Sequence, residues 1–341
     1  MVPERDDAMQ SSTEPPSSGW PAVGVIMPIL NEERHLEEAV AAVLSQDYPG
    51  PIELVLALGP SHDRTDEIAA QIVAREPRVR TVQNPTGKTP DALNAALAAS
   101  RSEIVVRVDG HGVLDKDYVR TAYELLQETG AANVGGLMDA EGVTPFERAV
   151  AAAMTSRLGV GSARFHTGGE AGAADTVYLG VFRRDWLDRL GGYDPRFVRA
   201  QDWELNHRIR KAGGVVWFSP RLRVVYRPRP TFAALARQYR DYGRWRRVVA
   251  RTHTGTINAR YLAPPVVLVV VIAGAVLGFV WPAAWVAPVG YVVATTIGGL
   301  SISTDLSLRE RLMLPLVLPT MHLSWGYGFL TSRVRIAPSS V

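Results

Sequence analysis

An aspartate and a histidine two residues apart, Asp109 and His111, have side chains that suit metal chemistry. They follow an apolar run at 103–108 that is rich in β-branched residues and predicts a buried strand. In an extended segment, positions i and i+2 point to the same side, so this carboxylate and this imidazole can face one divalent cation. Oxygen ligands suit Mg²⁺ or Mn²⁺, and an imidazole favours Mn²⁺. An Asx turn beside a surface histidine explains the same residues, so the motif alone leaves both interpretations open.

Strands and helices alternate along the first part of the chain and position these residues. Apolar runs predict strands at 23–29, 52–58, 79–83 and 103–108, and helical spacing or alanine-rich composition predicts helices at 32–45, 64–75 and 90–100. This alternation predicts an α/β domain with a parallel sheet covered on both faces. In such sheets, ligands bind at the carboxyl ends of the strands. The polar clusters at 31–33, 59–63 and 109–111 fall there, so we expect one site at that edge.

The composition excludes several kinds of chemistry. The chain has 341 residues, 47% hydrophobic and 21% charged, so it can bury a sizeable core and is not a disordered polymer. It has no cysteine, which excludes a disulfide scaffold, a thiolate zinc site, an iron–sulfur cluster and a cysteine nucleophile. The net charge of +3 predicts no general affinity for polyanions, and we expect no nucleic-acid partner.

The last third of the chain predicts membrane segments. No Asp, Glu, Lys, Arg or His lies between Leu262 and Thr304, and a bilayer core needs about 20 apolar residues per helix. The stretch therefore predicts two spans, 262–281 and 283–303. A further apolar stretch, 312–332, completes a transmembrane region of about three segments over 261–333, although the sequence leaves open whether this last one crosses. Buried core helices of a soluble protein are the alternative interpretation.

Charges beside these segments predict their orientation. Residues 231–260 read as a basic amphipathic helix, with apolar residues on one stripe and arginines on another, which suits the headgroup plane of an anionic leaflet. A solvated basic face over a core stripe is the alternative. The positive-inside rule places this side in the cytoplasm. Residues 1–21 are polar, lack a signal-peptide pattern and predict a disordered tail. We therefore expect a multi-pass protein of the inner or plasma membrane with its N-terminal domain in the cytoplasm.

Several segments, in order over about residues 23–247, resemble the family 2 glycosyltransferases. They are VGVIMPILNEERHLEEAVAAVLSQDYP, GPSHDRTDE, NPTGKTPDALNAAL, VVRVDGHGVL, YLGVFRRDWLDRLGGYD and QDWELNHRIRKAG. Within that family the chain is most similar to bacterial exopolysaccharide enzymes of the succinoglycan-biosynthesis type. Those enzymes also carry Asp-Gly-His where most relatives have Asp-x-Asp, and they also end in membrane spans. The resemblance implies a Rossmann-like GT-A domain over 22–230, but it does not identify the sugar.

The resemblance implies positions for the nucleotide-sugar. Pro28 and Glu32 border the nucleotide pocket, and Asp63 matches the acid that bonds the base. Lys88 lies where a basic residue approaches the nucleotide. Arg244 belongs to a partial match to the Gln-x-x-Arg-Trp motif of the superfamily, and we expect it to contact the diphosphate.

The resemblance also implies the reacting groups. Asp109 matches the first acid of the metal motif and His111 the metal ligand, whereas Asp202 matches the general base, with Gln201 in place of the family's preceding acid. Sugar transfer needs positive charge on the leaving diphosphate and a carboxylate that takes the acceptor's proton on the opposite face of the sugar. A single base attacking in line inverts the anomeric carbon. A first-turn acid that favours the helix dipole is the alternative for Asp202, and Glu204 on the same predicted helix is a second acid able to support it.

These features together predict a metal-dependent inverting glycosyltransferase that uses Mn²⁺ or Mg²⁺. The expected donor is a nucleotide-diphospho-sugar, UDP-linked, and the expected acceptor is a lipid-linked saccharide or a cell-envelope polysaccharide precursor. Membrane lipids are the other expected partners, and the sequence indicates no protein partner. Two alternatives stay open: transfer to polyprenyl phosphate itself, and a non-catalytic membrane scaffold that keeps a degenerate nucleotide-sugar pocket.

Overall fold

The computed structural model describes residues 19–302 and 305–336. Residues 1–18, most of the predicted N-terminal tail 1–21, lie outside this range. Trp20 belongs to that predicted tail, yet its ring packs 5.4 Å from Tyr48 and 5.0 Å from Tyr123, centroid to centroid. The folded part of the chain therefore begins earlier than the sequence predicts.

Four parallel strands form the first half of the sheet and confirm the predicted alternation. The strands are β1 (Val23–Ile29), β2 (Ile52–Leu58), β3 (Val79–Gln83) and β4 (Ile104–Arg107), and the helices between them are α1 (Leu36–Leu44), α2 (Thr65–Arg75) and α3 (Thr89–Ala99). The helix α1 begins four residues later than predicted. Residues 31–35 instead form the loop that carries Glu32 to the carboxyl end of β1.

The second half of the sheet is mixed, whereas the alternation in the first part of the chain predicts only the parallel half. The strand β8 (Tyr178–Arg183) runs antiparallel to β4 and to β6 (Asn133–Ala140). The full strand order is β3-β2-β1-β4-β8-β6-β9-β5, and β7 pairs with β9. The remaining elements of this half are β5 (Val113–Leu114), α4 (Tyr118–Thr129), α5 (Pro145–Thr155), α6 (Arg157–Val160), α7 (Arg164–Thr167), β7 (Gly172–Ala173), α8 (Arg184–Leu190), α9 (Gln201–Lys211) and β9 (Val216–Tyr226).

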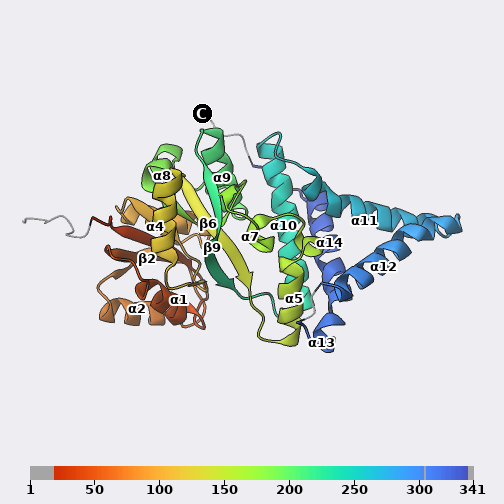
Figure 1. Cartoon of the computed structure of the whole chain (residues 1–341), viewed down its shortest axis with the longest axis horizontal. Coiled ribbons are helices and arrows are strands. Elements are labelled where there is room, and N and C mark those ends of the chain that lie inside the picture. Colours follow the sequence, from red (N-terminus) through yellow and green to blue (C-terminus); the bar gives the residue numbers. More distant parts are fainter. Residues whose placement is uncertain (1–18, 303–304, 337–341) are drawn as a thin grey trace, which may run out of the picture.

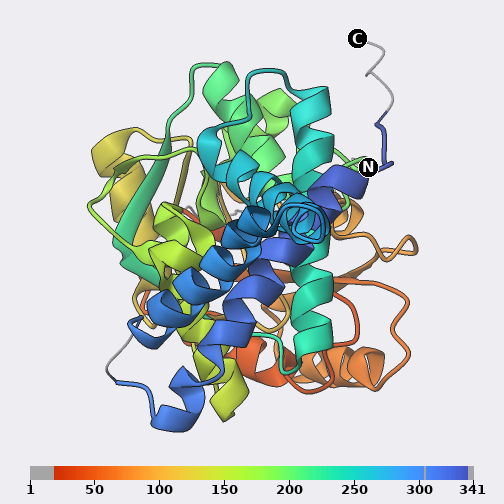
Figure 2. The same cartoon turned by 90° about the vertical axis from the view of Figure 1, so that its right-hand side faces the viewer.

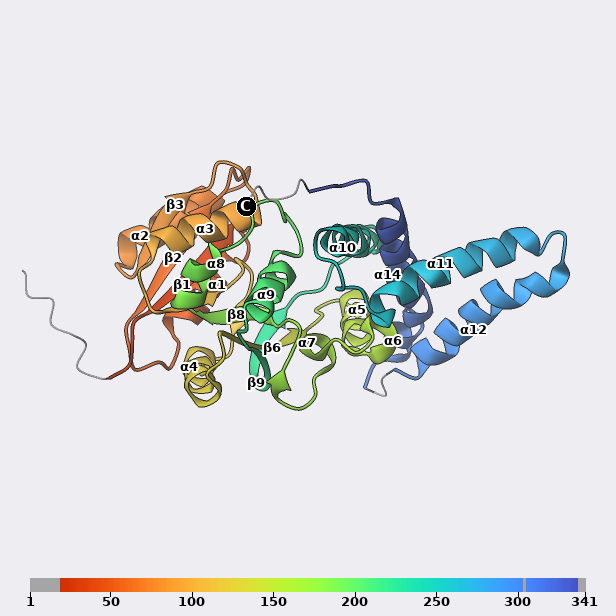
Figure 3. The same cartoon turned by 90° about the horizontal axis from the view of Figure 1, so that it is seen from above.

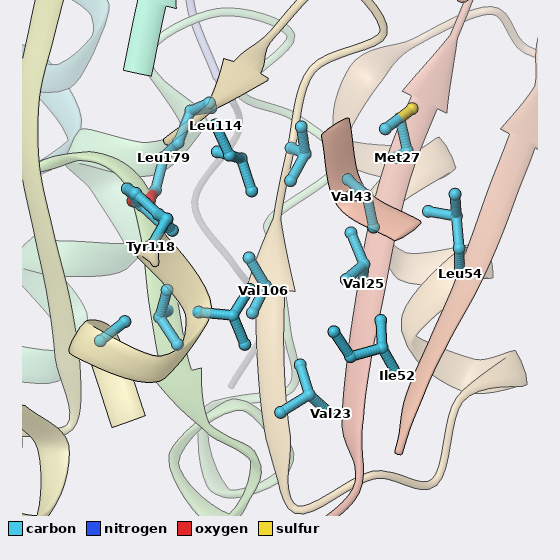
Figure 4. Close-up of a cluster of buried hydrophobic side chains, with 14 of the residues drawn as sticks. Val23, Val25, Met27, Val43, Ile52, Leu54, Val106, Leu114, Tyr118 and Leu179 are labelled. Atoms are coloured by element: carbon cyan, nitrogen blue, oxygen red, sulfur yellow. The ribbon is translucent and has the colours of Figure 1, made fainter. Parts of the chain in front are cut away.

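Both faces of the sheet are buried, as the apolar strands predict. Val23, Val25 and Met27 of β1 are fully buried on the face that α1 covers, together with Val106 of β4 (Figure 4). Ile26, between them in sequence, lies in the second core cluster on the opposite face. Each such buried side chain contributes about 1.5–3 kcal/mol relative to an exposed one. This two-sided core fixes the strand ends that carry the polar loops.

The C-terminal part forms a helical hairpin that projects from the α/β domain (Figures 1 and 3). It consists of α11 (Ala259–Leu277), η1 (Pro282–Trp285) and α12 (Val286–Leu300). Within the described residues, Ala259–Leu277 and Pro282–Leu300 are long and apolar enough to cross a membrane, and only 11% and 17% of their apolar windows are buried. Without a membrane, the exposed valines, isoleucines and leucines of these two helices would face water. The two helices support an association with the membrane.

The third predicted segment, 312–332, is not a further candidate span. It forms α14 (Leu314–Thr331), which follows the short α13 (Leu308–Arg311) and lies across the base of the hairpin beside α10 (Phe232–Thr252) (Figure 2). Its Leu314, Val317 and Met321 are fully buried in a core cluster shared with α5 and α10. Packing inside the protein, which the sequence does not show, explains the apolar residues on this side of α14, whereas Leu316, Tyr327 and Leu330 stay exposed.

The amphipathic helix forms, but over a shorter range than the predicted 231–260. Its apolar stripe is covered by protein rather than by lipid, because Leu235 and Tyr239 lie in the same core cluster as α14 and Val249 lies in another. The backbones of α10 and α14 almost touch, since a Cβ added at Gly243 would lie 1.9 Å from the carbonyl oxygen of Trp325. Most arginines of the basic stripe, Arg237, Arg240, Arg244 and Arg251, stay exposed, and Arg247 is half-buried.

Candidate active site

Arg107, the last residue of β4, brings Asp109 and Asp202 together. Its Nη2 lies 2.8 Å from Oδ1 of Asp109, and its Nη1 forms an ion pair with Oδ1 of Asp202 at the start of α9. Only 5% of the Arg107 side chain is exposed. A buried guanidinium is stable only when it is paired and hydrogen-bonded. Two carboxylates that are distant in the sequence therefore meet at the predicted edge of the sheet.

The charges around Asp109 keep it ionised. Burial opposes its ionisation, but Arg107, His111 and Arg199 together outweigh burial and hold the pKa of Asp109 below its usual range. At neutral pH the site therefore contains a fixed carboxylate with three nitrogen-bearing side chains acting on it.

His111 is oriented by Glu32, which comes from the loop after β1. The Nδ1 atom of His111 lies 2.8 Å from Oε1 of Glu32. This hydrogen bond is the largest cause that raises the pKa of His111, whereas burial and Arg229 act in the opposite direction. A carboxylate on Nδ1 fixes the ring and its tautomer and leaves Nε2 to serve as a ligand.

The donor set suits a cation that is bound jointly with a ligand. Among residues 19–302 and 305–336, no group of three or more His, Asp or Glu side chains could hold a metal ion by itself. Arg107 engages one oxygen of Asp109 and Glu32 engages one nitrogen of His111, which leaves one oxygen and one nitrogen as donors. Mg²⁺ characteristically takes one or two protein carboxylates and completes its shell with substrate phosphates. The residues therefore fit a cation whose other ligands are diphosphate oxygens.

Asp63 and the backbone of Glu32 join the two loops that follow β1 and β2. Asp63 Oδ1 accepts hydrogen bonds from the backbone N–H of Thr65 at 3.1 Å and from its hydroxyl at 2.5 Å. These bonds, the hydroxyl first, lower the pKa of Asp63. The Thr65 hydroxyl oxygen in turn accepts from the backbone N–H of Glu32 at 2.7 Å. Asp63 thus has a structural partner in its own loop, and its second oxygen accepts from the Glu33 N–H at 3.3 Å.

Pro28 and Lys88 lie on neighbouring elements of the same edge. Pro28 is half-buried in β1, where it pairs with Ala57 of β2. Lys88 is exposed at the residue before α3. The loops meet here, because a Cβ added at Gly59 would lie 3.5 Å from the Cα of Gly87. The structure therefore gathers Pro28, Lys88 and the Asp63 loop at one edge.

No described contact joins the predicted site residue Arg244 to the acids. Arg244 is exposed on α10, and its carbonyl oxygen accepts a hydrogen bond from the Ser332 hydroxyl. The arginines that act electrostatically on the site are instead Arg107, Arg199 and Arg229. Sequence reasoning missed all three, although an arginine inside an apolar strand is a signal that a buried acid must lie nearby.

Glu204 faces into the protein instead of supporting Asp202. Its side chain is 1% exposed, and it accepts hydrogen bonds from Arg208 at 2.8 Å and pairs with His253 Nε2 at 3.2 Å. His253 follows the last residue of α10, so this pair joins α9 to α10. Glu204 therefore positions the helix that carries Asp202.

Strained backbone lies beside these residues. Asn31, Leu179 and Ala200, with φ of 56°, 40° and 61°, are the non-glycine residues of positive φ in the described part of the chain. Asn31 precedes Glu32, and Ala200 precedes the first turn of α9 with Asp202. Such conformations cost about 1–3 kcal/mol each and persist where the surrounding structure fixes them, most often at functional sites.

Comparisons with known proteins indicate the family of this chain. A family model described as glycosyl transferase family 2 matches residues 24–191. The chain is 32% identical to the succinoglycan biosynthesis protein ExoA of Rhizobium meliloti over 309 residues, which cover 89% of this chain and 93% of that protein. It is 21% identical to a dolichyl N-acetyl-alpha-D-glucosaminyl phosphate 3-beta-D-2,3-diacetamido-2,3-dideoxy-beta-D-glucuronosyltransferase of Methanococcus voltae, over 92% of this chain and 97% of that one.

Solved structures share the fold at lower identity. The mannosyltransferase PcManGT of Pyrobaculum calidifontis, in complex with GDP-Man and Mn²⁺, superposes with a TM-score of 0.62 at 21% identity, over 93% of this chain and 89% of that one. S. aureus TarS in complex with UDP-GlcNAc superposes with a TM-score of 0.50 at 14% identity, over 91% of each chain. The relative that matches over nearly its whole length and the family model agree: this chain is a glycosyltransferase of the GT-A fold and belongs to glycosyl transferase family 2.

Proposed function

We propose that this glycosyltransferase moves a sugar from a nucleotide-diphospho-sugar, UDP-linked, to a lipid-linked saccharide or cell-envelope polysaccharide precursor, with inversion at the anomeric carbon. The observation that carries the proposal is the meeting of Asp109 and Asp202 on Arg107 at the carboxyl end of β4. The similarity to a succinoglycan biosynthesis protein and to an enzyme named for a dolichyl-phosphate-linked sugar supports this class of acceptor.

Asp202 acts as the general base in this proposal. It is 31% exposed, so one face of its carboxylate is open to an acceptor hydroxyl. Arg107 fixes the carboxylate and offsets part of the negative charge that Asp202 and Asp109 carry together. As the hydroxyl attacks the anomeric carbon, its proton passes to Asp202 while the bond to the diphosphate breaks on the opposite face. One displacement of this kind inverts the configuration.

Asp109 and His111 would hold a divalent cation, Mn²⁺ or Mg²⁺, with the diphosphate. When bound, the cation supplies positive charge to the leaving group. Pro28, Glu32, Asp63 and Lys88 would border the nucleotide in this arrangement. Arg244 stays a proposed partner of the diphosphate, and Arg199 and Arg229 are further arginines whose charges act on the site.

The protein would sit on the cytoplasmic face of the inner or plasma membrane as a multi-pass enzyme anchored by the α11–α12 hairpin. Both ends of a hairpin lie on the same side of the bilayer, so the α/β domain, α10 and α14 would share that side. The hairpin projects away from α10 and α14 (Figures 1 and 3), which would place these two helices at the membrane surface.

A donor screen tests the proposal. The purified full chain in lipid nanodiscs is mixed with UDP-, GDP- and dTDP-sugars, an extract of lipid-linked saccharides and Mn²⁺, and nucleotide release is measured for each donor. We expect acceptor-dependent release of UDP. Release of another nucleotide would contradict the UDP assignment, and retention of configuration in the product would contradict a single displacement by one base.

A further inference from the structure

A groove on the outer side of α10 is separate from the catalytic site. Two adjoining hollows of about 460 and 620 Å³ share the lining residues Ala233, Ala236, Leu323 and Ser324. Leu268 of α11 closes one end and Leu316 of α14 lines the other. Volumes of about 300–1,000 Å³ are typical of sites that bind small molecules.

The side of α10 that lines this groove does not carry the residues that reach the catalytic site. Ala233, Ala236, Arg237 and Arg240 have the i, i+3, i+4, i+7 spacing of one helix face. Gln238 and Tyr242 lie on another face, where Gln238 bonds the Tyr226 hydroxyl at 2.6 Å and Arg229 and Arg199 act on Tyr242. The helix α10 therefore separates the groove from the acids.

The lining of the groove combines apolar walls with a basic rim. Leu268, Leu316 and Leu323 supply hydrocarbon, and the alanines of α10 leave room for a ligand. Arg237 and Arg240 are exposed at the first hollow. The ion pair of Arg240 with Asp241 is long, 3.6 Å, and solvent reaches both side chains, which are 48% and 33% exposed, so it holds the guanidinium weakly. Guanidinium groups match phosphate oxygens in geometry as well as in charge.

We infer that this groove binds an anionic phospholipid of the surrounding bilayer. The phosphate would lie on Arg237 and Arg240, and an acyl chain would follow the alanines of α10 between α11 and α14. The position of the groove favours a bilayer lipid over the acceptor, because it opens beside the candidate span α11 and on the side of α10 away from Asp202. The lipid would join α10, α11 and α14 at the membrane surface.

Native mass spectrometry of the full chain released from a zwitterionic detergent tests the inference, with phosphatidylglycerol and phosphatidylcholine as probes. We expect phosphatidylglycerol to bind about tenfold more tightly than phosphatidylcholine, and Arg237→Gln with Arg240→Gln to remove this preference. The charge-matched control is Arg333→Gln with Arg335→Gln, two exposed arginines after α14, which should leave the preference unchanged.

A second variant tests the apolar part of the groove. Ala236→Trp fills the groove without changing charge, and we expect it to weaken phosphatidylglycerol binding by about tenfold at an unchanged melting temperature. Ala236→Ser, which leaves the groove open, is its matched control and should bind as the unaltered chain does. The inference would be overturned if both arginine double variants lost the preference for phosphatidylglycerol equally. It would also be overturned if Ala236→Trp bound phosphatidylglycerol as tightly as the unaltered chain does. Displacement of phosphatidylglycerol by inorganic phosphate would overturn the inference too, in favour of a site for free anions. Displacement by a tenfold lower concentration of a polyprenyl phosphate would overturn it in favour of a site for the acceptor.

Discussion

Replacing Arg107 by methionine tests the junction of the two acids. The substitution keeps a long side chain but leaves Asp109 and Asp202, 21% and 31% exposed, without their shared cation. Breaking a fully buried ion pair costs about 3–5 kcal/mol. Because solvent reaches part of both carboxylates here, we expect a loss of about 2–3 kcal/mol, which corresponds to a fall in melting temperature of about 5–10 °C for a domain of this size.

Thermal unfolding of the purified chain measures this loss, and a second ion pair in the chain provides the control. Arg75→Met removes the pair with Glu37, in which both side chains are about 60% exposed, so its loss should be at most about 1 kcal/mol. The loss in Arg107→Met should shrink as the pH falls from 7 to 4, because unpaired carboxylates then take up protons. Arg107→Lys should restore little, since one ammonium lacks the two separate nitrogens that contact the two acids. If Arg107→Met melts no lower than Arg75→Met, Arg107 does not stabilise the junction.

Three further predictions concern the metal, pH and the membrane hairpin. His111→Ala should weaken nucleotide binding in the presence of Mn²⁺ but not in EDTA; calorimetric titrations that give equal affinities with Mn²⁺ for both proteins would contradict the ligand role. Burial, together with His253, lowers the pKa of His207 to about 4. The unfolded chain, with a histidine pKa of about 6.5, therefore binds this proton first, and the free energy of unfolding should fall as the pH drops from about 6.5 to 4. His207→Gln should flatten that fall in denaturant titrations, and an unchanged slope would refute the assignment. Replacing residues 259–300 by a short linker should preserve donor binding. Removing residues 259–336 should destroy donor binding, because Leu314 and Val317 of α14 belong to the core. Equal donor binding by both deletion variants would contradict this role of α14.

The parallel half of the fold could be predicted because its strands carry their own signal. Strands such as β1 and β2 are short, apolar and rich in β-branched residues, and polar loops follow them. The antiparallel strand β8 could not be placed, since its pairing with β4 and β6 depends on segments distant in the sequence. The apolar stretch of α14 resembled a span for the same reason, because only its packing against α5 and α10 shows that it is a core helix.

The candidate site was predictable in part. Asp109 and His111 were proposed from their types and spacing, and Asp202 from the family resemblance. The structure joins Asp109 and Asp202 through Arg107 and pairs His111 with Glu32. Arg107 itself was missed because it was counted only as part of a strand. Arg244 was chosen from a partial motif, and its contact with the diphosphate stays a prediction. The close contact of Gly243 with α14 sets the rotation of α10, on which Arg244 is exposed. Which face of a helix meets a site is a tertiary property that spacing alone does not determine.

The most direct test of the proposed chemistry compares Asp202→Asn with Asp66→Asn. Both acids lie in the first turn of a helix, Asp202 in α9 and Asp66 in α2, so loss of a helix-dipole contact is common to the two variants. Donor affinity and acceptor-dependent nucleotide release are measured for each purified full chain. A catalytic base predicts that Asp202→Asn binds the donor within about threefold of the unaltered chain but loses turnover by at least about 100-fold, while Asp66→Asn keeps both. Turnover retained by Asp202→Asn, or lost only in proportion to donor binding, would contradict the assignment of Asp202 as the base.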